Sequence, residues 1–241
     1  PVGIVTRRDL IKLWLDENQN TPARQFMTSP VLSISESESV DKAGLRFIAD
    51  DVRHLVVINA NDEACGIISE TDVVNSHSME HDLFLRSVQD IADLSPASID
   101  GNVTVLSALK SLKESGRSAL FVSLKNQICG IFTERDAVTL LANNKQNDAI
   151  AELCSNTLIT IEQDLSLYNA RKVFHEHQFQ HLATTDDQGQ ITGLISYSDI
   201  LNSVEHDYVY RLRELLLVVC PPLVHTQHNL RLADKVIEAS M

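Results

Sequence analysis

The chain has no long hydrophobic run, few aromatic residues and no paired cysteine motif. No apolar stretch among its 241 residues approaches the ~18 residues that a membrane span needs, and no signal peptide opens the sequence. Aromatic residues make up 5% of the chain, and the single tryptophan, Trp14, lies in a helical pattern where we expect it to pack rather than to bind a ligand. The hydrophobic content of 44% is ordinary for a globular protein.

Signature motifs of enzymes and metal sites are also missing. There is no nucleophile elbow, P-loop or HExxH. The segment HEHQFQH contains His175, His177 and His181, but the first two would point to different faces of a helix and the third begins a predicted strand. We therefore predict no metal site and no catalytic role for this chain.

Positive charge is in short supply. Lys and Arg number 20 against 33 Asp and Glu, so the net charge is 20 − 33 = −13. A field of that sign repels phosphate backbones and anionic lipids, which argues against nucleic acid as a partner. A small anionic ligand stays possible, because helix ends and single arginines act locally.

The four cysteines, Cys65, Cys129, Cys154 and Cys220, form no CxxC pair. Cys65 and Cys129 each precede a glycine in a segment that should be a buried strand. We interpret the cysteines as small hydrophobic residues of a cytoplasmic protein in a reducing compartment.

What the sequence does have is an internal repeat. Four similar segments begin at glycines separated by 63, 64 and 63 residues, and an aspartate six residues after each glycine keeps the same spacing. The four aspartates are Asp9, Asp72, Asp136 and Asp199. The segments are GIVTRRDL from Gly3, GIISETDV from Gly66, GIFTERDA from Gly130 and GLISYSDI from Gly193.

Each complete repeat predicts an α/β unit with the order strand, helix, strand, hairpin, strand, helix. The second and fourth segments resemble each other best, so the repeats come in pairs. The sequence begins inside the first repeat, as an excised piece of a longer protein would. We divide the chain into the end of repeat one (residues 1–20), repeat two (25–88), repeat three (89–148), repeat four (149–205) and an exit helix or linker (206–241).

The signature G-h-h-[TS]-x-x-D (h, apolar), in paired copies about 60 residues apart, resembles that of CBS domains, whose tandem copies pack as Bateman modules. The resemblance covers about residues 1–205. It implies a regulatory module that binds adenosyl ligands: AMP, ADP, ATP or S-adenosylmethionine. Module A, made of repeats one and two, is incomplete here, so module B, made of repeats three and four, is the better candidate.

Two interpretations of the motif remain open. A helix N-terminus attracts phosphate, and the aspartate can accept hydrogen bonds from ribose hydroxyls. However, [ST]-x-x-[DE] also matches the helix capping box, which needs no ligand. On the ligand hypothesis, module B offers Thr133 and Ser196 for phosphate and Asp136 and Asp199 for ribose. The secondary candidates are Thr6, Arg8, Asp9, Ser69 and Asp72.

Basic residues distinguish the copies. The motifs of repeats one and three contain Arg7, Arg8 and Arg135, whereas SETD and SYSD contain none. Arg135 would supply phosphate charge, and the alternative is a surface ion pair with Glu134 or Asp136.

The C-terminal segment suggests an output. After Asp199 a helical pattern carries an apolar seam that would either pair with a second copy in a homodimer or pack on its own module. The seam residues are Leu201, Tyr208, Leu212, Leu215 and Val219, and Pro221 and Pro222 end the helix. The last residues, NLRLADKVIEASM, resemble the helical lead-in to a PAS domain in bacterial proteins that continue into GGDEF or EAL domains.

Two hypotheses follow. In the first, an adenosyl ligand in module B controls a downstream cyclic-di-GMP output domain. In the second, the repeats form a ligand-free dimerisation scaffold and the motifs are only caps.

Overall fold

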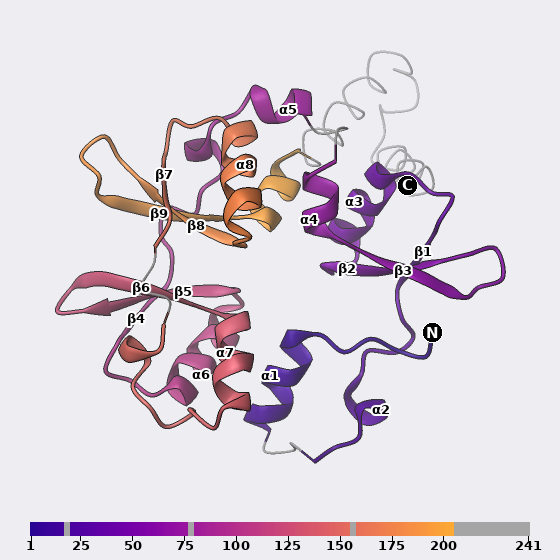
Figure 1. Ribbon diagram of the computed structural model, residues 1–241, viewed down its shortest axis with the longest axis horizontal. Coiled ribbons are helices and arrows are strands. Elements are labelled where there is room, and N and C mark those ends of the chain that lie inside the picture. The colour runs from indigo at the N-terminus through magenta and orange to yellow at the C-terminus, as the bar shows by residue number, and fades with distance from the viewer. Residues whose placement is uncertain (17–19, 77–79, 155–157, 205–241) are drawn as a thin grey trace, which may run out of the picture. The chain divides into compact units, whose positions relative to one another are not determined.

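The computed structural model describes residues 1–16, 20–76, 80–154 and 158–204, and within them each complete repeat folds as the sequence predicts. Every complete repeat is a strand, a helix, a two-stranded hairpin and a second helix (Figure 1). Repeat two contains β1 (Ser33–Ser35), α3 (Val40–Ala49), β2 (His54–Ile58), β3 (Ala64–Ser69) and α4 (Glu70–Val74). Repeat three contains β4 (Ser98–Asp100), α6 (Val105–Ser115), β5 (Ala119–Leu124), β6 (Gln127–Thr133) and α7 (Glu134–Ala142). Repeat four contains β7 (Thr160–Glu162), α8 (Leu167–His177), β8 (His181–Thr185), β9 (Ile191–Ser196) and a helix over 197–204.

Each repeat forms its own three-stranded sheet, in the orders β1-β2-β3, β4-β5-β6 and β7-β8-β9. The first strand runs parallel to the second, because a helix carries the chain back between them. In repeats two and three the hairpin makes the last two strands antiparallel, with His54 opposite Ser69 and Ala119 opposite Thr133. The α/β prediction is confirmed.

Hydroxyl side chains begin the first helix of every complete repeat. Ser39, Thr104 and Ser166 each accept a hydrogen bond from a backbone N–H of the first turn. The α6 helix ends at Gly116, whose φ of 66° is a left-handed conformation that glycine adopts at little cost.

The remaining described elements are α1 (Arg7–Leu15), which belongs to repeat one, and four short helices between repeats. These are α2 (Ala23–Phe26), α5 (Glu80–Phe84), η2 (Val88–Asp90) and η3 (Ile150–Glu152).

The linkers show how the repeats pair. The repeats pair as one with two and three with four. The linker that leads into one repeat makes backbone hydrogen bonds to its partner repeat. The backbone bonds join Ile4 to Thr28 (repeat one with the linker into two), Val88 to Leu165 (repeat four with the linker into three), and Ile150 to Val103 and Ala151 to Gly101 (repeat three with the linker into four).

The chain divides into two compact units, and repeat four contributes to both. Compact unit 1 comprises Pro1–Val31, Asp93–Gln163 and His181–Leu194, and compact unit 2 comprises Leu32–Ala92, Asp164–Gln180 and Ile195–Met241. We describe each unit by itself.

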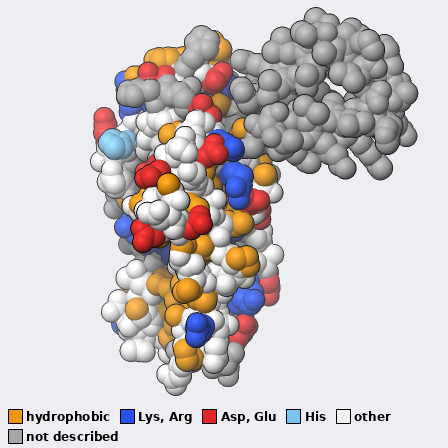
Figure 2. Space-filling model, turned by 90° about the vertical axis from the view of Figure 1, so that its right-hand side faces the viewer, with side chains coloured by type: hydrophobic (Ala, Val, Ile, Leu, Met, Phe, Trp, Pro, Cys, Tyr) orange, Lys and Arg blue, Asp and Glu red, His pale blue; other side chains and the backbone are white. Residues whose placement is uncertain are grey.

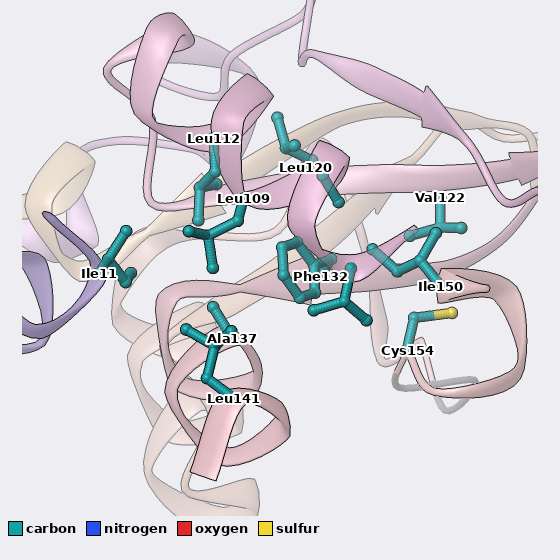
Figure 3. Packing of buried hydrophobic residues seen from close by; sticks show 12 residues of the cluster. Ile11, Leu109, Leu112, Leu120, Val122, Phe132, Ala137, Leu141, Ile150 and Cys154 are labelled. Atoms are coloured by element: carbon teal, nitrogen blue, oxygen red, sulfur yellow. The ribbon is translucent and has the colours of Figure 1, made fainter. Parts of the chain in front are cut away.

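Compact unit 1 has two hydrophobic clusters. In the larger one, Ile11 of α1 joins buried residues of α6 and α7 (Figure 3). Trp14 packs against this cluster. The packing role predicted for Trp14 is thereby confirmed. In the smaller one, the sheet of repeat three packs on strands of repeat four through Ala119, Phe121, Ala183 and Leu194.

The prediction that Cys65 lies in a buried strand is wrong. Cys65 is exposed, and its neighbour Ile67 is 63% exposed. The equivalent Cys129 packs against the larger cluster, which includes residues of the η3 linker. Among the described residues no linker hydrogen-bonds to repeat two in the corresponding way, so this side of β3 stays open. Cys154 is buried as predicted, and Cys220 lies outside the described residues.

The surface mixes charges of both signs. Figure 2 shows acidic side chains scattered among basic and hydrophobic ones on one face. No helix in the described part of the chain has the length and apolar character to span a membrane. Leu201 of the predicted exit seam is fully buried, and Tyr208, Leu212, Leu215 and Val219 lie outside the described residues.

Candidate functional site

The four Thr/Ser-x-x-Asp motifs all stand at helix starts. In each copy the aspartate Oδ2 accepts hydrogen bonds from both the backbone N–H and the hydroxyl of the capping residue. For Thr133 and Asp136 these distances are 2.9 and 2.8 Å. The same two bonds, between 2.6 and 2.8 Å long, join Thr6 to Asp9, Ser69 to Asp72, and Ser196 to Asp199. The capping interpretation therefore holds in every copy.

Capping occupies only one oxygen of Asp136. Both bonds end on Oδ2, and among the described residues Oδ1 accepts no hydrogen bond. A carboxylate oxygen can accept two hydrogen bonds. The side chain can therefore cap α7 and still accept bonds from a ligand, so the two interpretations are compatible.

A fifth capping box shows that the same geometry also forms outside the repeated signature. Ser87 and Asp90, at the start of η2, form the same two bonds at 2.8 Å, yet they lie outside the repeated signature. The backbone N–H and the hydroxyl of Ser87 lower the pKa of Asp90 below its ordinary value. Because this box needs no ligand, capping geometry alone is no evidence of a ligand site.

The helices α1 and α7 pack together in compact unit 1 and place three arginines near their N-termini. The Arg8 Nε donates to Glu134 Oε1 at 3.0 Å, and Glu134 is buried. Arg8, a predicted phosphate candidate, is thus held in an ion pair. The ion pair of Arg135 with Glu134 or Asp136, predicted as the alternative, does not form. Glu134 faces Arg8, and Asp136 binds its own capping residue. Within the described residues, the Arg135 guanidinium makes no ion pair or hydrogen bond and is exposed.

Compact unit 2 contains the corresponding contact with a serine in place of the motif arginine. Ser198 Oγ donates to Glu70 at 2.7 Å, and these residues occupy the motif positions of Arg8 and Glu134. Arg53 Nε lies 4.0 Å from Glu70, but neither motif of this pair contains an arginine. The arginine-bearing motifs are therefore those of compact unit 1.

The predicted site residues are distributed over both compact units. Compact unit 1 contains Thr6, Arg8, Asp9, Thr133, Arg135 and Asp136, and compact unit 2 contains Ser69, Asp72, Ser196 and Asp199. Within each unit the motifs meet in the pairs one with three and two with four. That repeats three and four share one ligand site, as expected for module B, stays a prediction.

The histidines of HEHQFQH are separated by the fold. His175 and His177 lie on α8, and His181 begins β8, where its Nε2 lies 2.7 Å from Ser118 Oγ. Among the described residues, no group of three His, Cys, Asp or Glu is arranged to hold a metal ion.

Two buried charges were not anticipated from the sequence. One is Glu134, and the other is Arg171 of α8, which is 8% exposed. Arg171 donates to the carbonyl oxygens of Val74 and Ser76 and to the Glu80 carboxylate at 3.2–3.3 Å. Its place on the apolar face of LYNARKVF was the available signal, but partners more than 90 residues away leave no local pattern.

The CBS domain family matches residues 23–78, 88–143 and 150–206, and the chain belongs to this family. Proteins of this kind act as regulatory ligand-binding modules. One relative is the uncharacterised protein MJ1404 of Methanocaldococcus jannaschii, 25% identical over 190 residues. The match covers 77% of this chain but only 44% of MJ1404, so the chain spans less than half of that relative.

The chain is similar to several solved structures. The crystal structure of protein MJ1225 from Methanocaldococcus jannaschii matches with a TM-score of 0.71 at 18% identity, covering 84% of this chain and 83% of that one. The CBS domain pair of protein MJ0100, solved with 5′-methylthioadenosine and S-adenosyl-L-methionine, has a TM-score of 0.47 at 22% identity and covers 51% of this chain and 98% of its own.

Proposed function

We propose that repeats three and four bind an adenine nucleotide or a related adenosyl compound and pass the bound state on as a regulatory signal. Thr133 and Ser196, with the helix N-termini behind them, bind phosphate. Asp136 and Asp199 accept hydrogen bonds from ribose hydroxyls, and Arg135 supplies positive charge. Thr6, Arg8, Asp9, Ser69 and Asp72 are the corresponding residues of the other pair.

One observation carries the proposal. Among the described residues, Arg135 is exposed and makes no ion pair or hydrogen bond. It lies between Thr133, whose hydroxyl caps the helix, and Asp136, whose Oδ1 accepts no hydrogen bond from the described residues. Glu134 and Asp136 already supply the negative charge that favours this helix start, so Arg135 adds nothing to the cap. This arrangement suits a phosphorylated ligand better than a simple cap.

Adenosyl compounds occupy solved CBS pairs: the MJ0100 pair contains two of them, and CBSX2 was solved with AMP. These are properties of those proteins. Because their likeness covers about half of this chain at low identity, the proposal depends on this chain's own residues.

The signalling part of the proposal concerns the C-terminal side. A ligand can shift a two-state equilibrium only by the difference in its affinity for the two states. We place the output in a cyclic-di-GMP domain, reached through a helix that pairs two copies in a homodimer. This part is supported only by the sequence pattern of residues 206–241, and the comparisons with known proteins add no support to it.

A second candidate function is a ligand-free scaffold. It is favoured by the complete capping boxes, which satisfy all four motifs without a ligand. In that case no nucleotide would stabilise the chain.

Calorimetric titration with AMP, ADP, ATP and adenosine tests the proposal. Asp136→Ala and Asp199→Ala should each weaken nucleotide binding by about tenfold or more, since a hydrogen bond to a charged group contributes about 1.5–3 kcal/mol. Arg135→Ala should weaken AMP binding while leaving adenosine binding nearly unchanged.

The matched control is Asp90→Ala, which breaks an equivalent box outside the signature. It should leave affinity unchanged. Equal losses of nucleotide affinity in Asp90→Ala and Asp136→Ala would mean that the substitutions act only through the stability of the fold. Absence of any saturable nucleotide binding to the wild-type chain would favour the scaffold.

A further inference from the structure

Two cysteines of compact unit 1 lie against the same core. Cys129, on β6, is half-buried, and its Sγ donates to the Val122 carbonyl at 3.3 Å. Cys154 is buried just after η3, with Sγ 3.7 Å from the Ala151 carbonyl oxygen. Figure 3 shows Cys154 beside Val122 and Ile150, and Cys129 packs against the same cluster. The two thiols therefore lie against one core, and each is placed next to Val122.

The surroundings of Cys154 act on the pKa of its thiol. Burial, together with the neighbouring Cys129 thiol and a hydrogen bond to it, raises the pKa of Cys154 to about 11. Cys154 thus stays protonated at neutral pH. The more accessible Cys129 is the thiol that an oxidant would reach first.

The location of Cys154 gives the pair a structural consequence. Cys154 lies in the linker into repeat four, and this linker is docked on repeat three through Ile150 and Ala151. A bond between the two sulfurs would fasten the linker to β6 covalently. The loop closed in this way contains α7 and the residues Thr133, Arg135 and Asp136.

Repeat two provides an internal comparison. Cys65 holds the same position before the repeat glycine and also donates to a carbonyl of the preceding strand, Val57, at 3.4 Å. It is exposed, and no linker in the described part of the chain is hydrogen-bonded beside it. Strand position alone therefore does not create a thiol pair, whereas the η3 linker does.

We propose that Cys129 and Cys154 form a reversible redox pair that locks the linker onto repeat three under hydroperoxide. The Cys129 thiolate attacks the O–O bond and becomes a sulfenic acid, releasing an alcohol, or water from hydrogen peroxide. The Cys154 sulfur then attacks the sulfenic sulfur, forms the S–S bond and releases water. Two thiols lose two electrons and two protons, which the hydroperoxide accepts. A thiol reductant reverses the step.

The test uses the 241-residue chain with Cys65→Ser and Cys220→Ser, which leaves two of its four cysteines, Cys129 and Cys154. After a small molar excess of hydrogen peroxide, free thiols are alkylated and counted by mass spectrometry, and peptides are mapped. We expect the alkylated thiols to fall from two to none, a mapped 129–154 cross-link, and full recovery with dithiothreitol. The melting temperature should rise on oxidation, because the cross-link restricts the unfolded chain.

Single variants separate the roles. Cys154→Ser should leave a sulfenic acid on Cys129 that dimedone traps, and circular dichroism checks that the variant is folded. Two alkylated thiols after peroxide, or over-oxidation of Cys129 without a cross-link, would overturn the proposal. In the wild-type chain, a cross-link from Cys129 to Cys65 or Cys220 in place of Cys154 would overturn it equally. None of these outcomes depends on nucleotide binding.

Discussion

At the scale of single residues, the aspartate of the repeated signature has a structural task in every copy. It accepts two hydrogen bonds from its capping residue and so satisfies donors that a helix start leaves open. A ligand role must be added to this task, since the same carboxylate serves both. Loss of stability and loss of affinity must therefore be measured separately in any variant of these residues.

The Ser87–Asp90 box allows the capping contribution to be measured alone. Because its hydrogen bonds lower the pKa of Asp90, the carboxylate stabilises the fold above the pKa of the unfolded chain. That contribution is lost as the pH falls through the lower pKa of the folded state. Urea unfolding of wild type and Asp90→Asn should differ at neutral pH and converge in acid. The difference should stay below about 1 kcal/mol, because the group is exposed. A difference that persists undiminished at low pH would contradict this.

Residue types with a local signature could be predicted, and those with distant partners could not. Thr133, Asp136 and Trp14 follow from spacing and helical pattern. Glu134 and Arg171 pair with residues far along the chain, and no local pattern encodes such a contact. The ion pair of Arg8, a predicted ligand residue, was missed for the same reason.

At the scale of elements, α1 belongs to repeat one but completes the core of repeat three. Ile11 is 5% exposed and packs with residues such as Leu109, Leu112 and Leu141 (Figure 3). Ile11→Ala should lower the free energy of unfolding by about 2–4 kcal/mol, because it leaves a cavity in a packed core. The neighbouring Lys12→Ala, at an exposed position, should change it by less than about 0.5 kcal/mol. Equal effects of the two substitutions in urea unfolding would show that α1 does not contribute to this core.

Element order was predictable because strand and helix patterns recur in register. Which residues each element buries could not be predicted. The sequence treats Cys65 and Cys129 as equivalent, yet only Cys129 is covered, because a linker from the next repeat lies over it. Burial of this kind is a tertiary contact, because it depends on which linker packs on which repeat.

At the scale of the whole molecule, the interleaved chain makes separate unfolding of the two compact units difficult. Repeat four supplies β7 and β8 to compact unit 1 and α8 to compact unit 2, and the chain passes between the units at five points. Neither compact unit is one continuous segment. We therefore expect a single cooperative transition.

Arg171→Leu in compact unit 2 tests this cooperativity against Trp14 in compact unit 1. The substitution leaves the Val74 and Ser76 carbonyls and Glu80 without a donor that they have now, and it should cost about 3 kcal/mol. Trp14 is the only tryptophan, so its fluorescence reports compact unit 1, while far-UV circular dichroism reports the whole chain. Both probes should shift together to lower urea. Lys172→Ala, next to it and exposed, should shift neither by much. A Trp14 transition that stays in place while the circular dichroism curve splits would show that the two compact units unfold independently.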